Sequence, residues 1–386
     1  MKFHWFFFLI VTAHLFAQDS LQISLLTCSP GAELYSTFGH SAIRVKNVET
    51  GSDIVFNYGT FNFREKNFYF KFMSGKLNYY LTTETMDDFM YSYTAENRSV
   101  YEQVFNLDKN SKTELSNALK TNALPAHRAY KYDFFWDNCS TRIRDKIQTA
   151  YSEKLEYPVF RPKPFRDYLH DYLQDQPWSK FGIDLVLGLP CDQIANTKEA
   201  MFLPMEMMKA YDSTLLGNKL ICTHSNEILA SIEEPNANTY FNPLTVSLFI
   251  LFISIVLKYF NKTTYWSNLI FIITGFAGII IFFLWFLSDH ITTKNNLHFI
   301  WANPLVLLFP WRKRLFRPSL LKMLNRVYCI LLTTLVIFFP FRLQDMPLAC
   351  IPIWISLTIM IFPELHIREL FNHNKNSEAG NLSINE

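Results

Sequence analysis

The chain has 386 residues, which is enough for two or three folded units. Its net charge of +2 is too small for the strongly basic surface of a nucleic-acid-binding protein, so we expect no nucleic-acid partner. Six cysteines without a Cys-x-x-Cys pair give neither a zinc nor a redox signature, and we expect no metal and no other cofactor.

The N-terminus predicts export. Residues 1–17 combine a lysine, an apolar run and a small residue, Ala17, before polar Gln18, as in a secretory signal peptide. An uncleaved anchor is the alternative, and it would export the following domain equally. We therefore expect residues 18–240 to form a periplasmic domain, in which disulfides are possible.

Two strands should follow one another near the start of this domain. Residues 21–30 predict a short strand that ends at a Pro–Gly turn, with Cys28 as a buried thiol. His40 opens a segment with strand alternation, and residues 53–61 predict the antiparallel return strand. Gly39 permits a close backbone approach or an unusual backbone angle beside His40.

Residues 63–95 are unusually aromatic. Phe68, Phe70 and Phe72 alternate with other large residues, so we expect a central strand that is buried on both faces. The functional alternative is an apolar wall that receives acyl chains, or a surface that rests on a bilayer.

The segment YDFFWDNCSTRIRD, residues 132–145, carries the strongest chemical signal. Asp137 or Asn138 can cap a helix over residues 139–151, which places Cys139 in its first turn. The helix dipole and the free N–H groups there favour a thiolate. We expect His40 to be the base of a Cys139–His40 pair.

Three further residues are candidates beside this pair. A catalytic histidine needs a third group to orient its ring, and Asn57 or Tyr58 would lie beside His40 if the strands pair as predicted. Arg142 lies one turn after Cys139, where it would steady the thiolate or hold a substrate phosphate. Ordinary packing or solvation is the alternative for each.

The remainder of this domain predicts helices at 108–122 and 202–211. Cys191 and Cys222 lie in loop-like sequence of an exported domain, so a disulfide between them is plausible.

Residues 241–364 predict a membrane domain of about five helices. The apolar segments are 243–260, 266–288, 297–311, 326–341 and 348–363, and only the second is long enough to be unambiguous alone. Six basic residues lie between 311 and 326, and five crossings place them and the polar tail, residues 365–386, in the cytoplasm. The sequence therefore predicts a multi-pass protein of the inner membrane.

The same topology places residues 288–305 on the outer side. This polar loop contains Asp289, His290 and Asn296, which we expect to bind substrate near the lipid headgroups, and also His298. A hydrated loop is the alternative, and metal binding by Asp289, His290 and His298 is a weaker one.

These segments together resemble one family. LLTCSPGAELYSTFGHSAIRV, FNYGTF, YDFFWDNCSTRIRD and the outer loop resemble the Lnb-type lipoprotein N-acyltransferases of Bacteroidota over nearly the whole chain. The N-terminal domain is in turn similar to circularly permuted papain-like folds of the NlpC/P60 type, in which the histidine strand precedes the cysteine helix. The fold class implied is therefore α+β, followed by a helical transmembrane bundle.

The resemblance implies an acyltransferase that uses Cys139 as nucleophile and His40 as base. It would move an acyl chain from a membrane phospholipid, through a thioester, to the α-amine of the diacylated N-terminal cysteine of a lipoprotein. Two alternatives remain: a membrane-anchored cysteine peptidase or amidase acting on the cell wall, and a non-enzymatic membrane sensor.

Overall fold

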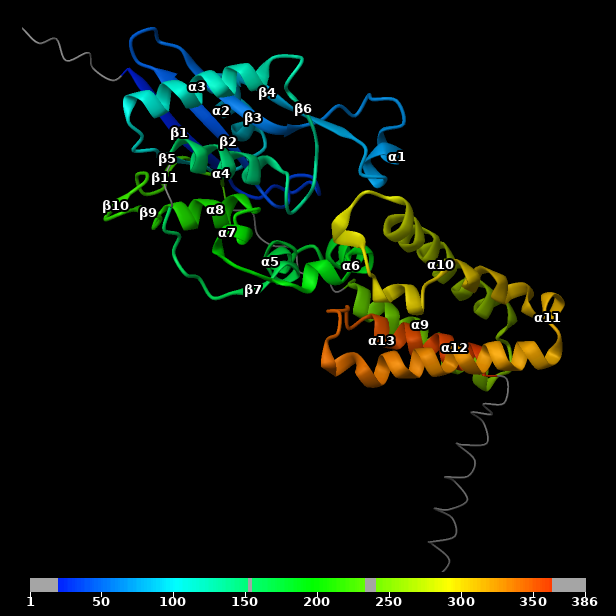
Figure 1. Ribbon diagram of the computed structural model, residues 1–386. Helices are drawn as coiled ribbons and strands as arrows, with labels where there is room; N and C mark the ends of the chain where they lie inside the picture. Colours follow the sequence, from blue (N-terminus) through cyan, green and yellow to red (C-terminus); the bar gives the residue numbers. More distant parts are fainter. Residues whose placement is uncertain (1–19, 152–154, 233–240, 363–386) are drawn as a thin grey trace, which may run out of the picture.

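A computed structural model describes residues 20–151, 155–232 and 241–362. The expected signal peptide, 1–17, and the expected tail, 365–386, lie outside the described residues. Figure 1 shows two parts side by side, a mixed α/β part formed by the N-terminal half and a helical part formed by the C-terminal half.

An antiparallel sheet organises the N-terminal part. Within the described ranges its seven strands follow the order β11-β5-β1-β2-β3-β4-β6. The strands are β1 Leu21–Cys28, β2 His40–Asn47, β3 Asp53–Thr60, β4 Asn78–Thr85, β5 Val100–Val104, β6 Ala129–Lys131 and β11 Asn226–Leu229. The central hairpins, β1 with β2 and β2 with β3, confirm the strands predicted over 21–30 and 53–61.

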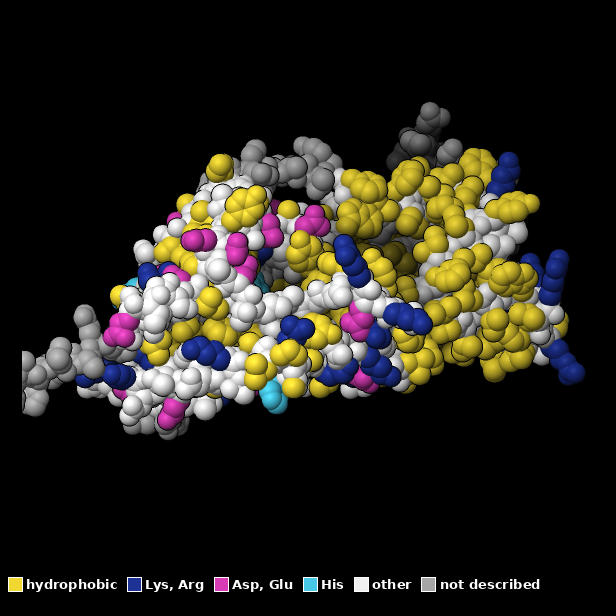
Figure 2. Space-filling view, turned by 90° about the horizontal axis from the view of Figure 1, so that it is seen from above, with side chains coloured by type: hydrophobic (Ala, Val, Ile, Leu, Met, Phe, Trp, Pro, Cys, Tyr) yellow, Lys and Arg dark blue, Asp and Glu magenta, His cyan; other side chains and the backbone are white. Residues whose placement is uncertain are grey.

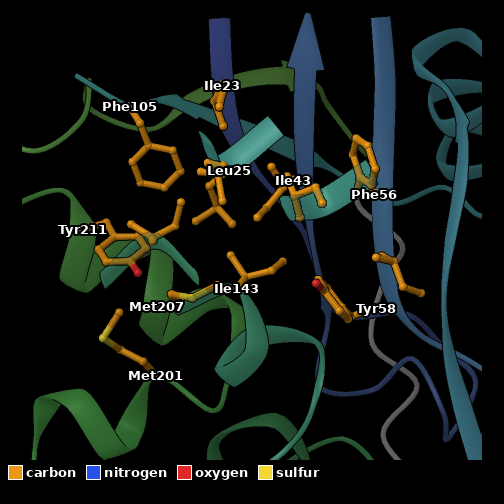
Figure 3. Close-up of a cluster of buried hydrophobic side chains, with 14 of the residues drawn as sticks. Ile23, Leu25, Ile43, Phe56, Tyr58, Phe105, Ile143, Met201, Met207 and Tyr211 are labelled. Carbon is orange, nitrogen blue, oxygen red and sulfur yellow. The ribbon is translucent and has the colours of Figure 1, made fainter. Parts of the chain in front are cut away.

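Helices cover both faces of this sheet, because alternate strand residues are apolar on each side. One face packs against α3 Lys109–Ala123, α4 Cys139–Ala150 and α8 Pro204–Tyr211, with Ile23, Leu25 and Ile43 in the shared core (Figure 3). The other face packs against α2 Met86–Ala95 through Leu26 and Phe89. The predicted helices at 108–122, 139–151 and 202–211 are confirmed.

The predicted central strand over the aromatic segment is wrong at Phe68–Met73, which forms the short helix α1. This helix lies in the connection between β3 and β4, at the edge of the domain, and the alternating aromatic residues therefore project from different sides of a helix. Phe68 packs inward, whereas Tyr69, Phe70 and Phe72 are exposed.

A subdomain of short elements follows α4 and lies beside the sheet. Phe135, Phe165 and Phe202 form its core. Its elements are β7 Lys163–Pro164, α5 Phe165–Tyr172, α6 Pro177–Val186, the 3₁₀ turn η1 Leu189–Asp192, β8 Ile194–Ala195 and α7 Thr197–Ala200. A small hairpin, β9 Leu215–Leu216 with β10 Lys219–Leu220, completes the N-terminal part.

Four helices of the C-terminal part match predicted membrane segments: α9 Pro243–Tyr259, α10 Thr264–Phe282, α12 Pro318–Phe338 and α13 Cys350–Ile361. With their helical extensions, Thr264–Leu287 and Pro318–Phe341 are long and apolar enough to cross a membrane, while α9 and α13 are shorter apolar helices. The extension of α10 is a π-helical turn, η2 Phe283–Leu287.

The third predicted membrane helix, 297–311, is not an α-helix. The outer loop contains η3 Ile291–Thr293 and η4 Leu297–Ile300, and η5 Pro304–Trp311 is a 3₁₀ helix with Pro310 inside it. A 3₁₀ helix rises about 2.0 Å per residue, so it covers more distance per residue than an α-helix. This segment packs along α10 where that helix lacks side chains: a Cβ on Gly278 would lie 2.4 Å from the backbone carbon of Asn303.

Basic residues mark the end of the helical part that is remote from the sheet (Figure 2). Arg312, Lys313 and Arg314 form the short helix α11 Arg312–Leu315, which connects η5 to α12. At the same end Lys258, in the last turn of α9, donates a 2.5 Å hydrogen bond to the carbonyl of Phe362. This arrangement agrees with the positive-inside rule if the sheet domain lies outside.

A buried arginine organises the joint between the two parts. Arg166 of α5 is fully buried and bonds both carboxylate oxygens of Asp192, at 2.7 and 3.1 Å, and Asp184 at 3.0 Å. Gln344, which follows α12, donates to the carbonyl of Leu187, and the backbone N–H of Asp345 donates to Asp192. The subdomain formed by α5, α6 and η1 is therefore connected to the helical part by hydrogen bonds from Gln344 and Asp345 to this charged cluster.

The predicted disulfide between Cys191 and Cys222 is wrong, since both are free, buried thiols. Cys191 donates to the carbonyl of Thr292 at 3.2 Å, in the joint, whereas Cys222 donates to that of Tyr211 at 3.3 Å, beside the sheet. Cys28 is buried and free, as expected.

Replacing Arg166 with alanine should destabilise the protein by about 3–5 kcal/mol, because it removes the guanidinium that pairs with the buried Asp184 and the partly buried Asp192. The thermal unfolding midpoint of the detergent-purified full chain would measure this. Arg161→Ala, at an exposed position of the same region, is the control and should change stability by less than about 0.5 kcal/mol. Equal midpoints for both variants would refute the structural role of Arg166.

Candidate active site

The N-terminus of α4 meets the ends of β2 and β3, and this junction brings Cys139, His40 and Asn57 together. Cys139 is the first residue of α4 and is half-buried, as is His40 at the first position of β2. Gly39 supplies the backbone angle that the sequence predicted, with φ of 81°, and a Cβ there would lie 2.7 Å from the carbonyl oxygen of Cys28.

Asn138 fixes the start of α4. Its side-chain oxygen accepts the backbone N–H of Thr141 at 2.9 Å, and the Thr141 hydroxyl accepts the backbone N–H of Asn138 at 2.8 Å, which completes a capping box. The Asn138 amide also donates to the carbonyls of Phe134 and Phe202. The helix end that carries Cys139 is therefore held from three directions.

The helix is also docked directly on the histidine strand. The buried hydroxyls of Ser41 and Ser140 share a 3.0 Å hydrogen bond, and each serine is the chain neighbour of a candidate catalytic residue. Since the first N–H groups of a helix have no partner within it, the backbone N–H of Cys139 is available to an oxyanion.

Three polar side chains form a line away from the thiol. His40 Nε2 lies 3.1 Å from Asn57 Oδ1, and Asn57 Nδ2 donates to Glu84 Oε1 at 2.7 Å. Because a carboxylate only accepts, the Asn57 amide must present its NH₂ to Glu84 and its oxygen to His40. His40 therefore carries a proton on Nε2, which leaves Nδ1 as the ring nitrogen for the thiol.

Charges at the junction favour an ionised pair. Burial alone would raise the pKa of Cys139, but the hydrogen bond and positive charge of His40 outweigh it, so the pKa lies below its ordinary value. Burial would likewise lower the pKa of His40, yet its hydrogen bond to Cys139 and the thiolate charge raise it. The arrangement thus suits a thiolate beside an imidazolium.

Tyr130 is a site residue that the sequence analysis missed. A Cβ on Gly59 would lie 3.5 Å from Cβ of Cys139 and 4.0 Å from the Tyr130 hydroxyl, so the tyrosine stands beside the nucleophile. Its buried hydroxyl has no hydrogen-bond partner among the described residues. Burial, and next the charge of Cys139, raise the pKa of Tyr130, so the hydroxyl keeps its proton. No motif signals this residue, since β6 is only a short strand.

Of the two candidates for the third member, the structure brings only Asn57 to His40. Ala42 pairs with Asn57 across β2 and β3, so Asn57 shares the sheet face of His40. Tyr58 points to the opposite face, where its hydroxyl donates to Asn122 at 2.6 Å.

Arg142 lies near the site but is already engaged. Its guanidinium binds both carboxylate oxygens of Asp137, at 2.5 and 2.8 Å, and stacks 3.6 Å from the ring centre of Tyr130. Arg142 therefore supports Tyr130 and the loop before α4, and a phosphate would have to displace Asp137 to reach it.

The three candidates of the outer loop are placed elsewhere. The backbone N–H of Asp289 donates to the carbonyl of Ser74, and His290 Nε2 donates to that of Phe72, so both residues contact the segment around α1. Asn296 is buried in the joint and donates to Leu185. His298 is fully buried with its Nδ1 occupied by Trp301, so the structure does not gather these histidines as metal ligands.

A different group of potential ligands lies in the joint. Asp167, His170 and Asp345 have ligand atoms within 4.8 Å of one another, but His170 already donates to Asp184 at 2.9 Å. These three residues lie beside the network of hydrogen bonds and ion pairs around Arg166, which His170 joins through Asp184, and we assign no metal to them.

An open groove of about 380 Å³ lies beside His40. Asn57 and Glu84 contribute to its lining together with Thr60, Thr82, Thr83 and Tyr93, and Glu84 is the carboxylate among them. The groove gives a substrate access to the face of the sheet on which His40 and Asn57 lie.

Comparison with known families adds two matches. Residues 13–171 match the model of the Lnb N-terminal periplasmic domain, and residues 234–369 match that of the Lnb transmembrane domain. Neither the curated proteins nor the solved structures contain a match to this chain.

Iodoacetamide should label Cys139 selectively at neutral pH, since the pKa of this thiol is lowered, whereas burial raises the pKa of Cys28, Cys191 and Cys222 to about 12. His40→Ala should slow the labelling at pH 7 at least about tenfold and move its pH midpoint upward, because the group that lowers the pKa is removed. Mass spectrometry of the labelled full chain measures this. An unchanged pH midpoint in His40→Ala would show that His40 does not lower the pKa of Cys139. The variant Cys139→Ser measures the background labelling of the other cysteines.

Proposed function

The chain belongs to the Lnb family, and from this premise we propose that it is a lipoprotein N-acyltransferase of the inner membrane. The acyl donor is a membrane phospholipid, and the acceptor is the α-amine of a diacylated lipoprotein. The observation that carries the proposal is the convergence of Cys139, His40 and Asn57 at one junction of a periplasmic domain that is joined to a membrane domain.

We further propose that the periplasmic domain is a circularly permuted papain-like fold spanning residues 18–240. Support comes from the order of its parts, since β2 with His40 precedes α4 with Cys139, and from the packing of α4 on an antiparallel sheet. The membrane domain, 241–364, is proposed to cross the bilayer several times, with the basic end around α11 in the cytoplasm.

The first half of the reaction makes a thioester. The Cys139 thiolate attacks the ester carbonyl carbon of the phospholipid, and the oxyanion is stabilised by the backbone N–H of Cys139 and the hydroxyl of Tyr130. The ester C–O bond then breaks, and the proton on His40 passes to the leaving alkoxide. The products are a lysophospholipid and an acylated Cys139.

The second half forms an amide. The neutral amine of the lipoprotein attacks the thioester carbon, His40 accepts the amine proton, and the C–S bond breaks to restore the thiolate. Asn57 keeps the ring of His40 in one tautomer through both steps. We place the amine in the groove beside His40, because the Glu84 carboxylate there favours an ammonium group over an anionic phosphate.

Loss of the nucleophile or the base should abolish lipoprotein N-acylation. In a deletion strain complemented with Cys139→Ser or His40→Ala, mass spectrometry of lipoprotein N-termini should show free α-amines, and the wild-type chain should restore the acyl group. Equal amounts of each variant in the membrane fraction provide the control. Unaltered N-acylation in the deletion strain would overturn the proposed activity, and altered muropeptides there would favour a cell-wall hydrolase.

Removal of the Tyr130 hydroxyl should lower kcat by about 10²–10³, the effect typical of losing one oxyanion donor, with little change in KM. Tyr130→Phe is the test, measured as amide formation by the purified full chain. Tyr58→Phe is the matched control, because the Tyr58 hydroxyl already donates to Asn122. Equal kcat for both variants would remove Tyr130 from the mechanism.

A further inference from the structure

One group of aromatic side chains in the N-terminal part stays largely exposed in the structure of the described residues. Residues 61–77, here called the aromatic hook, connect β3 to β4 and contain α1. Phe63, Tyr69 and Phe70 are 61%, 76% and 61% exposed. A contiguous group of exposed aromatic rings in a folded domain usually marks an interaction surface.

The aromatic hook is attached to the end of the membrane domain. The ring of Phe70 lies 5.7 Å from that of Phe283, at the end of α10. The backbone N–H of Asp289 donates to the carbonyl of Ser74, and the His290 side chain donates to the carbonyl of Phe72. Figure 1 shows α1 extending from the sheet toward the loop that follows α10. The exposed rings therefore continue the apolar surface of a membrane-spanning helix.

Basic residues flank these rings along the chain. Arg64, Lys66 and Lys76 are exposed, whereas Lys71 pairs with Glu65 at 2.7 Å. Aromatic rings flanked by lysine and arginine are typical of elements that lie in the headgroup region of a bilayer. The cations would meet lipid phosphates there, and the rings would meet the upper part of the acyl chains.

Ring contacts also connect the aromatic hook to the nucleophile. Phe68 lies 5.8 Å from Phe61, Phe61 lies 5.3 Å from Tyr79, and Tyr79 stacks at 4.3 Å on Tyr132. Tyr132 and Cys139 pack against the same hydrophobic core, and the charge of Cys139 contributes to the raised pKa of Tyr132. An unbroken aromatic series thus extends from the membrane end of the domain to Tyr132, which packs on the same core as Cys139.

We propose that the aromatic hook is a phospholipid-binding element that inserts into the outer leaflet. Its basic residues bind the lipid phosphate, and its exposed rings bind an acyl chain. The next step rests on the proposed function: the aromatic series directs the ester of that lipid toward Cys139. The ligand is a membrane glycerophospholipid.

Photo-crosslinking tests the binding without requiring catalysis. The full chain carrying Cys139→Ser is placed in nanodiscs that contain a phospholipid with a diazirine on one acyl chain, and labelled peptides are mapped by mass spectrometry. We expect label on 61–77, reduced at least about fivefold by Phe63→Ser with Phe70→Ser. Label on α12 is the internal standard, and Tyr91→Ser, at a 77% exposed position of α2, is the matched control. Labelled α12 without labelled 61–77 would overturn the proposal.

A charge variant leaves the apolar residues of the aromatic hook in place, and it has its own readout. Lys66→Glu with Lys76→Glu should reduce crosslinking of 61–77 to anionic phospholipid several-fold, with alkylation of Cys139 unchanged in the otherwise wild-type chain. Undiminished crosslinking would refute the role of the basic residues.

Acylation of Cys139 separates this proposal from the proposed function. In the otherwise wild-type chain, Phe63→Ser with Phe70→Ser should lower kcat/KM for thioester formation about tenfold, while alkylation of Cys139 stays unchanged. If 61–77 is labelled but the wild-type chain never forms acyl-Cys139, the acyltransferase proposal fails and lipid binding stands. An unchanged kcat/KM would refute the delivery of lipid to the thiol.

Discussion

The candidate site depends on one buried amide, the side chain of Asn138. Its oxygen caps α4, and its NH₂ group bonds the carbonyls of Phe134 and Phe202, which come from the loop before the helix and from the segment before α8. An aspartate would cap equally well but would repel both carbonyls. The amide therefore does more than start a helix: it sets the position of Cys139 relative to the histidine strand, and the Ser41–Ser140 bond then completes the docking.

The joint around Arg166 has a similar role on a larger scale. It is polar and charged, which is unusual for a contact between a sheet domain and apolar helices, and its bonds come from α5, α6, η1 and the residues after α12. Charged networks of this kind require defined geometry, because any displacement leaves a buried charge unpaired. They therefore hold the sheet domain in one orientation on the helices, with the aromatic hook at the end of α10.

Sequence reasoning was sufficient where local signals and global packing agree. The alternation after Gly39, the cap before Cys139 and the antiparallel return strand predicted β2, α4 and β3, and with them the meeting of Cys139 and His40. It could not choose between Asn57 and Tyr58, because adjacent strand residues differ only by register. The period of two at Phe68–Met73 misled the prediction, since aromatic residues surround α1 on all sides at the domain edge. Tyr130 became visible only through its unsatisfied hydroxyl.

The 3₁₀ conformation of η5 has a consequence for biosynthesis. The eight residues of η5 rise about 2.0 Å each, so this apolar segment spans only about half of a hydrocarbon core of roughly 30 Å. Its close packing relies on the bare backbone of α10 at Gly275 and Gly278. Since α10 precedes η5 in the chain, the surface against which η5 packs is synthesised before η5 itself.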